Sequence, residues 1–114
     1  MTLPIIQVEA TAKFKRDLRV LAKKYRSIRK DIQPIITQIE AGKILGDRVT
    51  GIGYTIFKLR VKNSNIQKGK SGGYRIIYYL KTIDKVILVT IYSKSEREDI
   101  SAKEIKQILN DLEQ

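Results

Sequence analysis

The sequence contains no cysteine and no histidine. Without cysteine there can be no disulfide bond, no thiolate nucleophile and no cysteine-rich zinc site. Without histidine the chain cannot build a Ser-His-Asp triad or any site that moves protons with a pair of imidazoles. If the protein catalyses a reaction that requires proton transfer, then lysine, tyrosine or carboxylate side chains must perform it.

Long apolar segments are also lacking. The opening residues, MTLPIIQVEATA, contain an apolar run too short to cross a membrane, no basic residue, and the acidic residue Glu9. These features predict a cytoplasmic protein without a membrane span. A chain of 114 residues has the length of one domain, so we expect a single domain over residues 1–114.

Acidic residues are scarce relative to basic ones. The chain has 23 Lys and Arg residues against 12 Asp and Glu residues, which gives a net charge of +11. This excess is greater than solubility requires, and a polyanionic partner such as nucleic acid is the simplest explanation. The positive charge is concentrated in residues 13–30 and 54–97, whereas residues 98–114 are acidic on balance. A solvated basic surface is the alternative interpretation, above all for the first block.

Three segments have the apolar spacing of amphipathic helices. The first covers residues 10–25, and the second follows it and ends at Gly42. We expect the second helix to begin at Asp31, which leaves Pro34 in the first turn; a start at Ser27 would require a kink at Pro34. The third helix follows Ser101, which forms a capping box with Glu104. Ile100 and Ile105 are placed as the hydrophobic staple of this last helix.

Strand patterns occupy the start and the centre of the chain. Residues 5–8 predict an edge strand, residues 57–62 alternate between apolar and basic side chains, and residues 74–80 and 86–92 predict a hairpin. The glycine-rich residues 42–53 indicate a connection and residues 63–73 a mobile polar loop. The expected fold is α+β in the order β-α-α-β-β-β-α. It has an antiparallel sheet of about four strands with a mixed edge, and helices packed on one face.

Basic side chains on the strand at residues 57–62 form the first candidate site. If Phe57 and its alternate neighbours face the helices, then Lys58, Arg60 and Lys62 form a cationic row on the opposite, open face of the sheet. Arg75 interrupts an otherwise apolar strand, where an unpaired charge is costly. It therefore requires either a bound phosphate or a salt bridge, for which Glu96 and Asp99 are candidates. A solvated strand face is the alternative for the row.

The loop and the tyrosines add further candidates. Lys68 and Lys70 flank Gly69 as in a phosphate-contacting loop, although the spacing of a Walker motif is not met. Tyr92 ends a strand beside Lys94 and is suited equally to base stacking and to packing. The other strand tyrosines are expected to pack: Tyr74, Tyr78 and Tyr79. The acidic residues crowd around the third helix start rather than converging from several elements, so we expect no metal and no cofactor.

These residue types suit cleavage of RNA by its own 2′-hydroxyl. That reaction needs in-line geometry, a proton acceptor, cations for the charge that builds on phosphorus, and a proton donor for the departing 5′-oxygen. Arginine supplies a planar, permanently charged fork for phosphate, and crowded lysines depress one another's pKa, so that one of them can exchange a proton. Tyrosine supplies a stacking surface or a phenolic proton.

Several motifs together resemble the RelE/ParE superfamily of toxins, most closely its HigB-like branch. They are residues 57–60 (FKLR), 69–79 (GKSGGYRIIYY), 88–96 (LVTIYSKSE) and 98–101 (EDIS). With the order of the helices, the resemblance covers almost the whole chain. It implies a toxin of a type II toxin-antitoxin system: an endoribonuclease that cuts translated mRNA in the ribosomal A site without a metal and is neutralised by a cognate antitoxin.

The resemblance also implies roles for individual residues. The catalytic candidates are Lys58, Arg60, Arg75, Tyr92 and Lys94, and the RNA-binding candidates are Lys62, Lys68, Lys70 and Arg97. RelE-type enzymes often have a lysine where this chain has Ile56 and a tyrosine where it has Ser101. We hypothesise that Tyr92 replaces that tyrosine, with Lys58 or Lys70 completing proton transfer. The alternatives are a ParE-like inhibitor of DNA gyrase and a nucleic-acid-binding protein that does not cleave.

Overall fold

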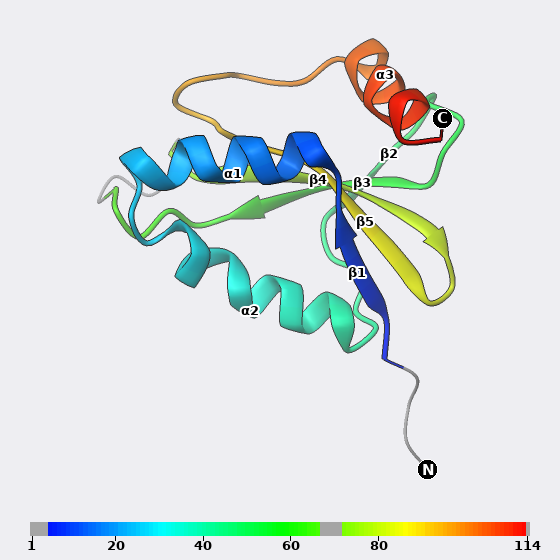
Figure 1. Ribbon diagram of the computed structural model, residues 1–114, viewed down its shortest axis with the longest axis horizontal. Helices are drawn as coiled ribbons and strands as arrows, with labels where there is room; N and C mark the ends of the chain where they lie inside the picture. The colour runs from blue at the N-terminus through cyan, green and yellow to red at the C-terminus, as the bar shows by residue number, and fades with distance from the viewer. Residues whose placement is uncertain (1–4, 67–71, 114) are drawn as a thin grey trace.

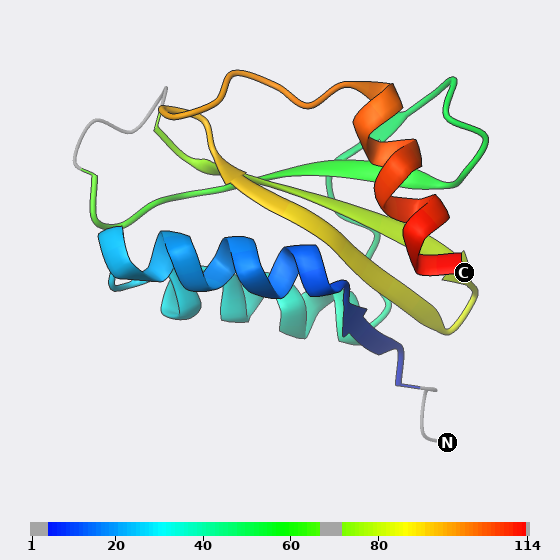
Figure 2. The same cartoon turned by 45° about the horizontal axis from the view of Figure 1, so that its top comes forward.

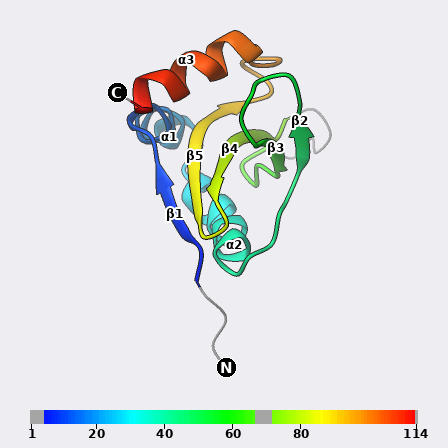
Figure 3. The same cartoon turned by 90° about the vertical axis from the view of Figure 1, so that its right-hand side faces the viewer.

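The fold is a mixed five-stranded sheet with helices on both faces. The computed structural model describes residues 5–66 and 72–113. The elements follow one another as β1 (Gln7–Ala10), α1 (Ala12–Lys24), α2 (Ile28–Glu40), β2 (Asp47–Val49), β3 (Ile56–Val61), β4 (Tyr74–Thr82), β5 (Lys85–Ser93) and α3 (Ala102–Glu113). The strands lie in the order β1-β5-β4-β3-β2, with β1 parallel to β5 and the other pairs antiparallel (Figure 3). The predicted α+β class, mixed edge and central hairpin are confirmed.

The sheet has one strand more than expected. The three-residue strand β2 lies in the segment interpreted as a connection, and it pairs antiparallel with β3 at the sheet edge. Strand β2 was not predicted because glycines surround it. One of these glycines is required by the pairing with β3: Gly46 has φ +87°, and a Cβ there would lie 2.4 Å from the carbonyl oxygen of Lys58. Only glycine allows the chain to pass so close to β3.

The expectation that the helices share one sheet face is wrong for α3. Helices α1 and α2 cover one face, and α3 lies on the opposite face (Figures 1 and 2). The core under α1 and α2 contains Phe14, Ile28, Ile32, Ile39, Leu59, Tyr74, Ile76 and Tyr78, among others. The core under α3 contains Ile56, Ile77, Val89, Tyr92, Ile105, Ile108 and Leu109, among others. Because β4 and β5 are apolar on both faces, each face requires a helix to cover it.

Helix α2 begins one turn earlier than the favoured start at Asp31, at the alternative start after Ser27. It starts at Ile28 after Ser27, so Pro34 lies inside the helix rather than in its first turn. The additional turn buries Ile28 completely, which offsets part of the cost of an internal proline. Asp31 does not cap the helix; its carboxylate accepts hydrogen bonds from the backbone N–H (2.9 Å) and the hydroxyl (3.0 Å) of Ser64. The predicted end at Gly42, with φ +96°, is confirmed.

Side-chain hydroxyls cap the starts of α1 and α3. Thr11 caps α1: its Oγ1 accepts from the N–H of Phe14 (2.9 Å) and donates to the carbonyl of Val89 on β5 (2.7 Å). Ser101 accepts from the N–H of Glu104 (3.1 Å), which is the serine half of the predicted capping box, whereas the Glu104 carboxylate pairs with Arg97. Within the described part of the chain, no helix has both the length and the apolar composition needed to cross a membrane.

Candidate nucleic-acid interface

Two arginines and a tyrosine form a row across the three central strands. Arg60 on β3 lies opposite Arg75 on β4, and Arg75 lies opposite Tyr92 on β5. We call these three residues the cross-strand row. They share the sheet face with Ile56 and Ile77, which α3 covers, but the row lies beyond those residues, toward the end of β3. Arg60 is exposed, whereas Arg75 is only 9% exposed.

Neither arginine of the row has a carboxylate partner among the described residues. The guanidinium of Arg75 donates through Nη1 to the carbonyl of Tyr74 (3.2 Å). Its predicted alternative partners are occupied elsewhere, because Glu96 lies 3.7 Å from Lys24 and Asp99 binds Lys58. A Cβ at Gly73 would lie 2.7 Å from the carbonyl of Val61 and 3.5 Å from Nη1 of Arg75. Glycine at position 73 therefore allows the chain to pass close to the end of β3, whereas the distance to Arg75 is that of an ordinary van der Waals contact.

Asp99 connects two of the predicted catalytic residues. Its Oδ1 accepts from Nζ of Lys58 (3.0 Å), from the hydroxyl of Tyr92 (3.2 Å) and from the backbone N–H of Ile100 (2.8 Å). The hydrogen bond from Ile100, followed by that from Lys58, lowers the pKa of the Asp99 carboxyl below its usual value. Asp99 is therefore an anion at neutral pH, and it is a hydrogen-bond acceptor for all three donors.

Tyr92 is held as a protonated phenol. Burial raises the pKa of Tyr92 to about 12, and the negative charge of Asp99 adds to the effect. The guanidinium of Arg97 lies 5.8 Å from the centre of the Tyr92 ring, within the range of a cation–π contact. At neutral pH the phenol is a proton donor rather than a base.

Arg97 and Lys94 are engaged within the protein. Arg97 forms a two-pronged ion pair with Glu104, and its Nε donates to the backbone carbonyl of Asp99 (2.8 Å). Hydrogen bonding to Glu104 raises the pKa of Arg97, and the pairing with Arg97 lowers the pKa of Glu104. Nζ of Lys94 donates to the carbonyl of Glu98 (2.6 Å), and its backbone N–H donates to Gly73 (2.9 Å). Both residues thus hold the 94–99 segment in place beside the sheet.

The remaining RNA-binding candidates have different positions. Lys62 follows β3 directly and is exposed. Lys68 and Lys70 lie outside the described residues. Tyr74 and Tyr78 are buried in the core under α1 and α2, as predicted for packing residues, and Tyr79 packs against the core under α3. The structure therefore brings Lys58, the cross-strand row and the 94–99 segment to one end of the sheet, with Lys62 beside them.

Asp99 is the site residue that the sequence interpretation did not include. In the sequence Asp99 is a candidate partner for Arg75, one of several acids near the third helix, and part of the motif at residues 98–101, without a role of its own. A local signal exists, because Asp99 precedes the capping residue Ser101 by two positions and so lies where a loop meets a helix. That signal does not identify Lys58 and Tyr92 as its donors, since both lie on strands distant in sequence.

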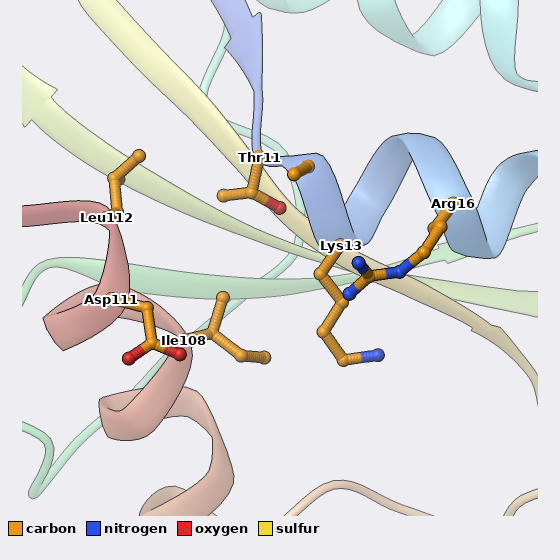
Figure 4. Close-up of a pocket in the computed structure, with 7 residues that line it drawn as sticks. Thr11, Lys13, Arg16, Ile108, Asp111 and Leu112 are labelled. Carbon is orange, nitrogen blue, oxygen red and sulfur yellow. The ribbon is translucent and has the colours of Figure 1, made fainter.

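A separate cavity lies away from these residues. It has a volume of about 360 Å³ and lies between the start of α1 and the end of α3. Lys13 and Arg16 line it from α1, and Asp111 and Leu112 line it from α3 (Figure 4). None of the predicted site residues lines this cavity. No group of three or more potential metal ligands occurs among the described residues.

A comparison with known protein families identifies the chain. The model of the RelE toxin of the RelE/RelB toxin-antitoxin system matches residues 9–111. The match extends from β1 into α3 and includes the cross-strand row, Lys58 and Asp99. The chain therefore belongs to the RelE toxin family and is a toxin of a toxin-antitoxin system.

Proposed function

We propose that the protein is a ribosome-dependent endoribonuclease that cuts translated mRNA in the A site without a metal. The observation that supports this proposal is the pairing of Arg60 with Arg75 beside Tyr92. Two adjacent guanidinium groups without carboxylate partners among the described residues have unused donors that fit phosphate oxygens. A neighbouring phenol supplies a proton donor at the same place.

The proposed reaction is attack of the 2′-oxygen on the adjacent phosphorus, with cleavage of the bond to the 5′-oxygen. Arg60 and Arg75 bind the phosphate and stabilise the charge that develops on it. Tyr92, whose pKa is raised to about 12, donates its proton to the departing 5′-oxygen. The 2′-hydroxyl proton passes to Lys58, the candidate among the described residues, after its ammonium, which pairs with Asp99, has released a proton to solvent. Lys94 and Lys62 add positive charge around the RNA backbone.

The cognate antitoxin would neutralise the toxin by covering this cationic end of the sheet. The net charge of +11 favours an acidic or amphipathic element as the covering segment. The protein would act in the cytoplasm, where translation takes place. Binding of the antitoxin would exclude RNA both by occupying the space and by pairing the guanidinium groups of Arg60 and Arg75.

Inducible expression followed by mapping of mRNA 5′ ends tests the proposal. We expect new ends within translated reading frames that disappear when initiation is blocked. Arg60→Ala and Arg75→Ala should lose the cuts, whereas Lys106→Ala, which removes an exposed cation from α3, should retain them. Circular dichroism of each purified variant establishes that it folds.

A gyrase supercoiling assay on the same proteins separates the alternatives. Inhibition of supercoiling without new mRNA ends would support a ParE-like activity and contradict the proposal. Binding to RNA without either effect would support a nucleic-acid-binding protein that does not cleave. Cuts that persist in both arginine variants would exclude the cross-strand row as the site of cleavage.

A further inference from the structure

One carboxylate oxygen joins three elements of the fold at the edge of the cross-strand row. Oδ1 of Asp99, in the segment before α3, accepts from Lys58 on β3, from Tyr92 on β5 and from the N–H of Ile100. The two side-chain donors are both candidates for proton transfer in the proposed reaction. Because they share one acceptor atom, their polar ends are held next to each other.

We infer that Asp99 is a positioning residue for RNA cleavage, which fixes the Lys58 amine and the Tyr92 hydroxyl side by side next to the phosphate-binding arginines. The inference rests on the proposed function. Asp99 itself need not touch the RNA. Its role is to limit the orientations of the Lys58 side chain and the Tyr92 hydroxyl, so that both are in place when the phosphate binds.

The distribution of carboxylates supports this role. Arg60 and Arg75 have no ion-pair partner among the described residues, whereas Asp99 binds Lys58 and Tyr92. If this carboxylate served only to reduce the positive charge of the site, a position beside Arg60 and Arg75 would serve equally well, because the repulsion between like charges is strongest there. The arrangement instead leaves the guanidinium groups available for phosphate and restrains the residues assigned to proton transfer.

A second set of contacts holds Asp99 in turn. Nε of Arg97 donates to the backbone carbonyl of Asp99 (2.8 Å), and the rest of its guanidinium is paired with Glu104 on α3. The same guanidinium lies 5.8 Å from the Tyr92 ring centre. Arg97 therefore supports the position of both Asp99 and Tyr92, and this engagement differs from the direct RNA contact that the sequence suggested for it.

Two substitutions at one position test the inference. Asp99→Asn keeps an oxygen that can accept from Lys58, Tyr92 and Ile100, whereas Asp99→Ala removes it. Cleavage is measured with purified protein on ribosomes programmed with a defined mRNA. We expect Asp99→Ala to lower kcat by roughly tenfold to a hundredfold, because two catalytic groups lose their alignment. Its KM should stay the same or fall, since a negative charge beside the RNA is removed.

The asparagine variant separates positioning from charge. It should retain kcat to within about threefold of the wild-type value if alignment by the acceptor oxygen is what matters. Wild-type kcat in Asp99→Ala would overturn the inference, as would an equal loss of kcat in both variants. A fall in cleavage that appears only as a raised KM would also overturn it, because Asp99 would then affect RNA binding and not alignment.

Titration of Tyr92 provides a readout that does not depend on cleavage. The phenol is followed by NMR in protein labelled at the tyrosine Cζ carbon, and the Tyr92 signal is assigned by its absence in Tyr92→Phe. The charges that act on this phenol come from Asp99, Arg75 and Arg97. In wild type the pKa should be about 12, and Asp99→Ala should lower it toward the ordinary value of 10.0.

The two readouts identify which proposal fails. An unchanged Tyr92 pKa in Asp99→Ala would show that the contact is absent in solution and would overturn the inference even if the wild type cleaves RNA. A wild-type protein that folds, shows the expected titration and cuts no mRNA would contradict the proposed function, and the inference would fall with it. Cleavage by wild type, loss in Asp99→Ala and retention in Asp99→Asn would support both.

Discussion

Arg60 and Arg75 lie directly opposite each other on adjacent antiparallel strands. Like charges in this position repel, at a cost of up to about 1 kcal/mol relative to a neutral pair. Among the described residues no carboxylate lies within ion-pair distance of either one. The pair thus lowers the free energy of unfolding of the free protein. An anion that binds between the two guanidinium groups would raise that free energy again.

Neutralising one member of this pair should stabilise the protein. We expect Arg60→Gln to raise the free energy of unfolding by roughly 0.2–1 kcal/mol at low salt and to weaken its dependence on salt. Arg60 is the better choice, because it is exposed and its replacement leaves no cavity. Urea unfolding at low and high ionic strength measures both effects, with Lys106→Gln as a matched exposed cation on α3. A larger gain in the Lys106 variant would contradict the repulsion.

Removing the Thr11 hydroxyl should destabilise the fold. This hydroxyl is buried, accepts from Phe14 and donates to Val89, so it joins the start of α1 to β5. Thr11→Val preserves the shape but leaves both backbone groups without a partner, which should cost about 2 kcal/mol. Thr11→Ser keeps the hydroxyl and should cost about 1 kcal/mol or less. Denaturant unfolding of the two variants gives the comparison, and equal losses would exclude the hydrogen bonds as the cause.

Replacing Pro34 should stabilise α2. An internal proline removes one backbone hydrogen bond and crowds the preceding turn, at a cost of about 3 kcal/mol, although it also restricts the unfolded chain. Pro34 is exposed, so Pro34→Ala should yield a net gain of about 1–2 kcal/mol without loss of packing. Thermal unfolding measures this gain against Gln33→Ala, an exposed neighbour. A loss of stability in Pro34→Ala would indicate that the proline relieves a constraint in α2.

Alkaline pH should destabilise the protein partly through Tyr92. Its pKa is raised from 10.0 to about 12 by burial and by Asp99, so the folded state favours the neutral phenol. The resulting contribution is fully present below pH 10 and is lost as the pH rises toward 12. Between pH 9 and pH 11 this amounts to about 1 kcal/mol of unfolding free energy. Tyr92→Phe should lose less stability over that interval in urea unfolding; an equal loss would contradict the assignment.

The elements with strong periodicity could be predicted from the sequence. The helix predicted over residues 10–25 corresponds to α1, the predicted hairpin corresponds to β4 and β5, and Ser101 caps α3 as predicted. Strand β2 could not be predicted, because three residues among glycines carry no period and its pairing with β3 depends on tertiary contact. The start of α2 was mispredicted because local proline preference was outweighed by burial of Ile28.

The basic residues of the candidate site could be proposed from the sequence, but the residues that they lie opposite or bind could not. Lys58, Arg60 and Arg75 were identified from charge on strand patterns, and strand register then places Arg60 opposite Arg75. Register also determines which cation Asp99 reaches. The sequence offered Arg75 as its partner, whereas the fold brings Asp99 to Lys58 and Tyr92. The side of the sheet that α3 covers decides this outcome, and helical periodicity alone contains no information about that side.

The parallel pairing of β1 with β5 has a consequence for synthesis of the toxin. Gln7 lies opposite Lys85, so the first strand of the described chain gains its partner only after residues 85–93 have been made. The same residues supply Tyr92. A nascent chain that is still shorter than this has neither a closed sheet nor a complete cross-strand row. The cross-strand row is thus assembled only after β5 has been synthesised.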